Sequence, residues 1–270
     1  MITRPVKRLF AFGCSYTRYA WPMWPEVIKL EFGDQIEYYN FGHSGAGNEY
    51  IRHQLFHANQ EFSFDQDDLV IVCWSSVFRS DWFIKSHRGW FTEGNILHPG
   101  TCNEKLAPDL LNINHYIIRD ASIMTGGSKF LETLTSQTHQ ICMLDNFFPG
   151  EKDHQFFETE ILDHPECKPM IDYLNTKLKP SFWEMGYDQD YNENKLIILP
   201  PEDRDTHPMP IDSMKYLSKV FDYEFSPDTI KGVEEWESKL WNIMINRPSD
   251  SGIVLQEYIE TKFPEFSQPF

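Results

Sequence analysis

The sequence lacks an excess of basic residues. Its 24 lysines and arginines stand against 41 aspartates and glutamates, which gives a formal net charge of −17 over 270 residues. Nucleic-acid binding relies on clustered Lys and Arg side chains that release counterions from the phosphates. We therefore expect no DNA or RNA partner for this chain.

Paired cysteine motifs and long apolar runs are also missing. The five cysteines are odd in number, scattered, and never spaced as Cys-x-x-Cys, which favours free thiols in a reducing compartment. No run of about 18 apolar residues is present, and the first residues lack the pattern of a secretory signal. We expect no membrane span and no membrane partner, and a cytoplasmic location.

The composition that remains is that of a globular chain rich in aromatic rings. Hydrophobic residues make up 41% of the chain and charged residues 24%, close to globular averages, which excludes wholesale disorder. Aromatic residues make up 15%, more than packing usually requires. The surplus predicts that some rings line a surface.

Short apolar runs that end in glycine or small polar residues recur along the chain. Runs of this kind are typical of strands buried on both faces of a parallel sheet. The predicted strands are residues 8–12, 36–40, 69–74, 141–144 and 196–199, and helical spacing covers residues 24–32, 48–58, 115–136 (interrupted at Gly126-Gly127) and 212–223. Their alternation predicts an α/β fold, a three-layer α/β/α sandwich with a mostly parallel central sheet of the flavodoxin-like kind.

Two connections, residues 79–114 and 146–194, are too long to be plain turns, so we expect them to hold inserts that shape a site. After Pro227, apolar residues at helical spacing predict a helical C-terminal extension. The expected organisation is one domain over residues 1–225, with residues 226–270 packed against it.

Reactive or small residues follow the predicted strands. In an open parallel sheet, functional groups gather at the carboxyl ends of the strands. The candidates there are Ser15, Gly45, Asn48, Ser75, Ser76, Asp205 and His207. We expect these segments, distant in the sequence, to meet at one edge of the sheet.

The candidate set contains the parts of a nucleophilic serine site. A serine hydroxyl becomes a nucleophile when an imidazole accepts its proton and a carboxylate holds that imidazole in the right tautomer. Residues two apart in an extended chain point the same way, so Asp205 can orient His207; Asp203 is a second candidate. The backbone N–H groups of Ser15 and Gly45 can face a developing oxyanion.

The order of these blocks over Leu9 to Leu217 resembles the SGNH (GDSL-type) hydrolase superfamily, in particular phage-like members with a G-C-S-[FY]-T start and a D-x-H-P close. The resemblance implies an SGNH-type sandwich in which Ser15 is the nucleophile, Gly45 an oxyanion donor, and His207 with Asp205 the base and its partner. It implies an esterase without cofactor or metal, acting on a small-molecule or glycan ester such as an acetylated carbohydrate. A viral setting also fits.

The sequence departs from that family in three places. Cys14 stands where Asp is usual, and Arg204 occupies the carboxylate position of the D-x-x-H spacing. The third block reads Ser75-Ser76-Val77-Phe78 instead of G-x-N-D, so the oxyanion asparagine is missing. Loss of one such donor typically costs roughly 3 kcal/mol of transition-state stabilisation.

Ser75, Ser76 and Asn48 are the candidates to replace the missing donor. If none does, the alternative is a catalytically silent protein of this fold that serves as a glycan-binding or virion-associated structural protein. In the esterase hypothesis, the aromatic residues of the first insert, such as Trp82 and Trp90, stack on the sugar rings of the substrate. Arg79 and Trp82 are further candidates to line the pocket.

His53 and His57 have the spacing of the two ends of a zinc motif, H-E-x-x-H. Position 54 is Gln and no third ligand is evident, so we expect solvated helix histidines and no metal. A metallohydrolase built on this pair is the weakest of the hypotheses.

Overall fold

A computed structural model describes residues 5–84, 89–95, 113–144, 161–182, 207–247, 255–262 and 264. Four strands form the central sheet in the order β2-β1-β3-β6. They are β1 (Arg8–Phe12), β2 (Glu37–Asn40), β3 (Asp68–Trp74) and β6 (Gln137–Cys142). All three strand pairs are parallel, which confirms the expected sheet.

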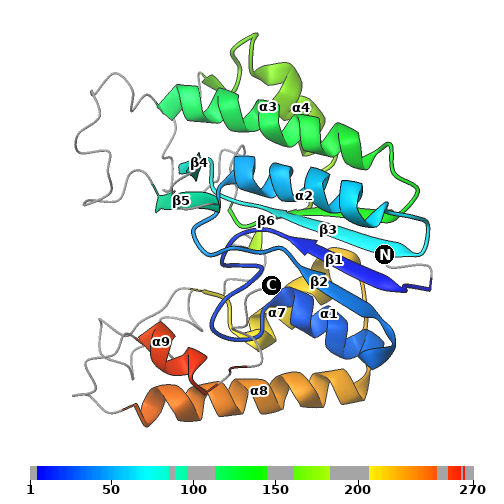
Figure 1. Ribbon diagram of the computed structural model, residues 1–270, viewed down its shortest axis with the longest axis vertical. Coiled ribbons are helices and arrows are strands. Elements are labelled where there is room, and N and C mark those ends of the chain that lie inside the picture. Colours follow the sequence, from blue (N-terminus) through cyan, green and yellow to red (C-terminus); the bar gives the residue numbers. More distant parts are fainter. Residues whose placement is uncertain are drawn as a thin grey trace.

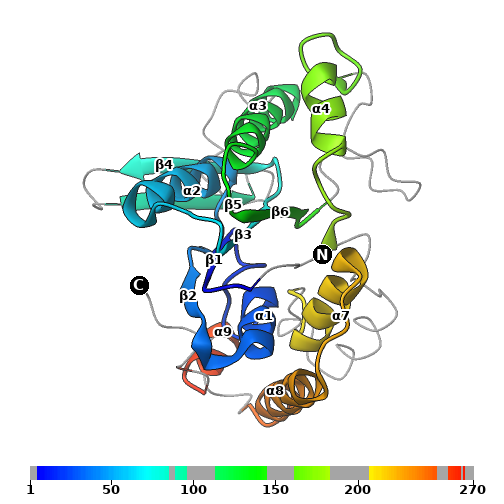
Figure 2. The ribbon, with the colours of Figure 1, turned by 90° about the vertical axis from the view of Figure 1, so that its right-hand side faces the viewer.

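Helices cover both faces of the sheet and complete the three layers (Figure 1, Figure 2). On one side lie α2 (Asn48–Phe62), α3 (Ile113–Leu131) and α4 (Lys168–Asn175). On the other side lie α1 (Trp24–Phe32), α7 (Pro210–Phe221) and α8 (Pro227–Ile245), with the short helix α9 (Leu255–Glu260) near α8. A 3₁₀ turn, η1 (Gly33–Gln35), follows α1. The α/β/α sandwich is therefore confirmed.

The strands are buried because they sit between these layers. Every residue of β3 is buried, and Leu9 to Phe12 of β1 have no exposed surface. This explains why both strands are continuously apolar rather than alternating. The predicted strand at 196–199 lies outside the described residues.

Two predicted elements differ in the structure. The helix expected to break at Gly126-Gly127 is the continuous helix α3, and a Cβ on Gly127 would lie 2.6 Å from Trp74 Cη2. Gly127 is thus a point of close helix-to-sheet approach and not a turn. The first insert contains an antiparallel hairpin of β4 (Arg79–Ile84) and β5 (Gly89–Asn95) that the sequence analysis did not predict.

Helix α8 packs against α1 and α7. Val233, Leu240 and Met244 are buried on its inner side.

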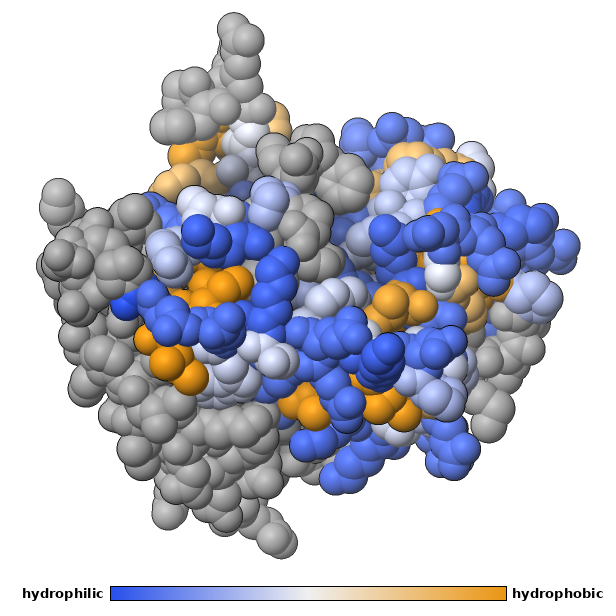
Figure 3. Space-filling model, turned by 90° about the horizontal axis from the view of Figure 1, so that it is seen from below, coloured by the Kyte–Doolittle hydropathy of each residue, from blue (hydrophilic) through white to orange (hydrophobic). Residues whose placement is uncertain are grey.

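Seen from below, the described surface is mostly hydrophilic, with separate apolar spots (Figure 3). None of the helices in the described ranges combines the length and apolarity that crossing a bilayer requires. The four described cysteines are free and buried.

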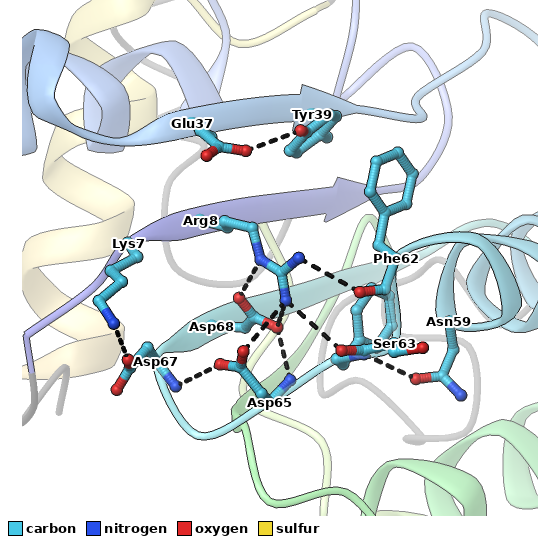
Figure 4. Close-up of polar contacts among 11 residues, drawn as sticks. Lys7, Arg8, Glu37, Tyr39, Asn59, Phe62, Ser63, Asp65, Asp67 and Asp68 are labelled. Atoms are coloured by element: carbon cyan, nitrogen blue, oxygen red, sulfur yellow. Dashed lines mark hydrogen bonds and ion pairs between the residues drawn. The ribbon is translucent and has the colours of Figure 1, made fainter.

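The amino ends of β1 and β3 are joined by a buried ion pair (Figure 4). Arg8 donates from Nε and Nη2 to the two carboxylate oxygens of Asp68 at 2.6 and 2.7 Å, and Asp68 has no exposed surface. Arg8 also donates to the carbonyl oxygen of Phe62 at 3.2 Å, which fixes the end of α2. One guanidinium thus ties two strands and a helix together at the edge opposite the strand carboxyl ends.

We expect Arg8→Met to lower the free energy of unfolding by about 3–5 kcal/mol, because it leaves the Asp68 carboxylate buried without its partner. Urea unfolding followed by circular dichroism measures the change. Lys7→Met removes the neighbouring exposed pair with Asp67 and is the matched control, for which we expect little change. Equal losses in the two variants would contradict the role of burial.

His139 on β6 is a half-buried titratable group. Its ring packs edge-on against Phe221 at 4.9 Å, and no described residue accepts from or donates to its Nε2 atom. Burial lowers the pKa of His139 to about 4. The folded state therefore binds fewer protons than the unfolded state between pH about 6.5 and 4.

The stability contributed by neutral His139 is present above pH about 6.5 and is lost as the pH falls toward 4, on the order of 2 kcal/mol in all. In His139→Leu this part of the acid dependence should vanish. Unfolding free energies of both proteins at pH 7, 6, 5 and 4 give the difference. His57→Gln, at an exposed histidine, should keep the wild-type slope. A His139→Leu profile parallel to wild type would refute the assignment.

Candidate active site

Ser15 lies in a tight turn directly after β1. The N–H groups of Thr17 and Arg18 both donate to the carbonyl oxygen of Cys14, at 2.9 and 3.1 Å. Gly13 permits this turn, because a Cβ there would lie 1.9 Å from Thr17 Oγ1 and 3.0 Å from the Cys73 carbonyl oxygen. Ser15 itself is almost fully buried. The turn thus holds a serine at the carboxyl end of the central strand.

The glycine-rich loop after β2 lies beside this turn. Phe41 N–H donates to Ala11 at 2.8 Å and His43 N–H to Gly13 at 3.1 Å, which extends the pairing of β2 with β1 into the loops. Gly45 has φ +81°, a left-handed conformation that favours glycine. The sequence-predicted glycine turn is therefore adjacent to the serine turn.

Asn40, which the sequence analysis did not single out, joins the two loops. Its Oδ1 accepts from Gly42 N–H at 2.9 Å, and its Nδ2 donates to the Thr17 carbonyl at 3.0 Å and to Glu26 Oε1 at 3.1 Å. Burial raises the pKa of Glu26. An amide at the end of β2, directly before the glycine-rich loop, is the signal that could have identified this residue.

His207 lies against the serine turn. Its ring stacks on Tyr19 with centroids 3.7 Å apart and planes 17° apart, and it is 5.5 Å from the ring of Tyr16, the neighbour of Ser15. Trp21 Nε1 donates to the carbonyl oxygen of Pro208 at 2.9 Å. The segment before α7 thus meets the loop after β1, although 192 positions separate Ser15 from His207. Asp203 and Asp205 lie outside the described residues.

The residues expected to replace the missing asparagine have structural contacts of their own. Asn48 Oδ1 accepts from Ser75 N–H at 2.8 Å, and its Nδ2 donates to the Ser75 carbonyl at 3.2 Å and lies 3.8 Å from Met124 Sδ. The side-chain amide of Asn48 thus connects the first turn of α2 to the residue that follows β3 through two hydrogen bonds. Ser76 Oγ accepts from Phe78 N–H at 3.2 Å and shapes the turn into β4.

Asp81 on β4 caps helix α2 from outside. Its carboxylate accepts from Gly47 N–H at 2.8 Å and from Tyr50 N–H at 3.0 Å, and burial raises its pKa. Beside it, Arg119 Nη2 pairs with buried Asp120 at 2.8 Å and donates to the Arg79 carbonyl at 2.6 Å. Burial raises the pKa of Asp120 to about 7. These contacts fasten the hairpin to the glycine loop.

The hairpin presents aromatic rings at the surface. Trp82 and Phe91 face each other across the strands, with centroids 6.3 Å apart and exposures of 41% and 43%. On its other face Trp90 packs edge-on against Tyr50 at 6.0 Å. Part of the aromatic surplus therefore lies at the surface.

The two histidines of α2 lie side by side on the helix. The rings of His53 and His57 are 6.1 Å apart, and burial lowers the pKa of His53. In the described ranges no group of three or more His, Cys, Asp or Glu side chains is placed to hold a metal ion.

No protein-family model and no curated protein matches this chain. Solved structures that match include an acetylxylan esterase (a catalytic mutant of Axe2) from Geobacillus stearothermophilus, at 12% identity and a TM-score of 0.43 over 83% of this chain and 98% of that one. Another is a lipolytic G-D-S-L family member from Veillonella parvula, at 12% identity and a TM-score of 0.40 over 80% of this chain and 97% of that one. A third is the psychrotrophic esterase EstA from Pseudoalteromonas sp., at 11% identity and a TM-score of 0.41 over 80% of this chain and 100% of that one.

Gly47 marks the closest approach between the hairpin and the glycine loop. A Cβ at Gly47 would lie 2.7 Å from Asp81 Oδ2 and 3.1 Å from Arg79 Cβ, so Gly47→Ala forces one of them to move. We expect a loss of roughly 1–3 kcal/mol in unfolding free energy. Thermal and urea unfolding measure it.

Gly126→Ala is the matched control, because nothing lies within 4 Å of a Cβ on this exposed glycine of α3. Removing a helix glycine should stabilise the protein by about 0.5–1 kcal/mol. The same sign of change in both variants would contradict the steric argument.

Proposed function

We propose that this protein is a serine hydrolase that cleaves an acyl ester, with Ser15 as the nucleophile, His207 as the general base and Asp205 as the residue that orients His207. The observation that carries the proposal is the stacking of His207 on Tyr19, within the turn that presents Ser15. Stacking fixes the plane of the imidazole, which a proton acceptor needs.

The proposed reaction has two halves. Ser15 Oγ forms a bond to the ester carbonyl carbon, its proton passes to His207, and the carbonyl electron pair moves onto the oxygen. That pair then returns, the bond to the alcohol oxygen breaks, and the alcohol leaves with the proton from His207. A water molecule repeats the sequence on the acyl-serine and releases the acid.

The substrate class follows from charge and from the surface rings. A net charge of −17 disfavours the approach of anionic substrates, so a neutral ester is preferred. The exposed rings of Trp82 and Phe91 are aromatic surfaces of the kind on which a sugar ring can stack. We infer an acetyl or other short acyl group on a carbohydrate or similar polar alcohol.

Ser15→Ala and His207→Ala should each lower the rate of p-nitrophenyl acetate hydrolysis by at least about 10³-fold, because each removes a member of the acyl-transfer group. The orienting carboxylate is identified by comparing Asp205→Asn with Asp203→Asn: the variant with the larger loss of hydrolysis rate lacks it. His164→Ala is the control, since this histidine also lies in an Asp-His-Pro sequence but in the second insert.

A fluorophosphonate label followed by peptide mapping provides an independent check, because it reacts only with an activated serine. We expect modification of Ser15. Background hydrolysis that is equal in wild type and both alanine variants, with no labelled serine, would instead favour the glycan-binding alternative, which the exposed ring pair also supports.

A further inference from the structure

Arg79, the first residue of β4, has a positive charge that no described carboxylate neutralises. Its Nη1 donates to the Ala46 carbonyl at 3.1 Å, its Nη2 lies 3.7 Å from Met143 Sδ, and its buried Nε has no acceptor in the described part of the chain. A partly buried cation without a counter-ion is unusual in a chain with 41 acidic residues.

The other tightly held arginines show the contrast. Arg8 is paired with Asp68, and Arg119 with Asp120. The carboxylate of Asp81, two residues from Arg79, is engaged with the first turn of α2 instead. Asp81 is thus used elsewhere, and within the described part of the chain the Arg79 guanidinium contacts a carbonyl and a thioether.

The guanidinium contacts the glycine loop and the segment that follows β6. Ala46 directly follows Gly45, and Met143 directly follows β6. Met143 Sδ in turn lies 3.4 Å from the sulfur of Cys14, the residue before Ser15. Among the described residues, both guanidinium contacts of Arg79 are therefore with segments next to a residue of the proposed reaction.

We propose that Arg79 stabilises the negative charge that forms on the ester carbonyl oxygen, an inference that rests on the proposed function. When Ser15 Oγ bonds to the carbonyl carbon, the electron pair that moves onto the oxygen is met by the guanidinium and by the backbone N–H groups. A cation in a water-poor site favours such an oxyanion over the neutral ester, so it acts on the transition state. The alternative, recognition of a negatively charged substrate, conflicts with the net charge of −17.

Arg79→Met tests the inference with p-nitrophenyl acetate as the probe substrate. We expect kcat to fall by about 10²–10³-fold with KM changed by less than about threefold, because the lost interaction is made only in the transition state. Arg52→Met, at an arginine of α2 outside the site, should leave both constants unchanged. Near-ultraviolet circular dichroism verifies that each variant is folded.

Chemical rescue provides the readout that a purely structural role would not give. Guanidinium chloride at low millimolar concentration should restore part of the kcat of Arg79→Ala, which leaves room for the free cation, and should not affect wild type. The rescue experiment with Arg79→Ala also tests the inference if Arg79→Met proves unfolded.

The outcomes separate the two proposals. If Ser15→Ala keeps full activity, both the proposed function and the role of Arg79 are overturned. If Ser15→Ala is inactive, three results would overturn the role of Arg79 alone. These are an unchanged kcat in Arg79→Met, a change in that variant confined to a higher KM, and no rescue of folded Arg79→Ala by guanidinium.

Discussion

The parallel pairing of β1 with both β2 and β3 is the constraint on which the candidate site depends. Because all three strands point the same way, their carboxyl ends share one edge. The chain leaves β1 toward α1 on one face and leaves β2 toward α2 on the other (Figure 1). In open parallel sheets, ligands bind at the carboxyl ends of the strands. The serine turn and the glycine loop follow β1 and β2 at this edge.

Buried polar side chains lock this edge, and each is satisfied by backbone groups. Asn40 bonds to the backbone of both loops, Asp81 to the first turn of α2, and Asn48 to the backbone of Ser75. A buried polar group is stabilising only when its partners are in place, so these bonds permit few alternative loop positions. Rigid loops of this kind are what positioning a nucleophile and its oxyanion donors requires.

The amino-acid sequence predicted the elements whose signal is local. The buried runs at β1 and β3 and the apolar spacing of α1 and α7 predicted their bounds to within two residues. The β4–β5 hairpin was missed because its exposed aromatic residues do not alternate with polar ones. Asn40 and Asp81 were missed because their partners lie in other segments, and a cap supplied from β4 leaves no trace in the sequence of α2. Ser15 and Gly45 follow β1 and β2 in the sequence, as their places in the chain predicted.

Aromatic rings at the site explain why a histidine from a distant segment can be held without a helix or strand of its own. The ring of His207 stacks on Tyr19, and Tyr19 packs edge-on against Trp21 at 4.5 Å, whose indole N–H holds Pro208. Stacked and edge-on rings restrict each other's orientation through their quadrupoles. Since Tyr19 and Trp21 belong to the same loop as Ser15, any movement of that loop carries the imidazole's support with it. The aromatic excess of this chain is therefore used partly at the surface and partly to couple the early and late segments of the fold.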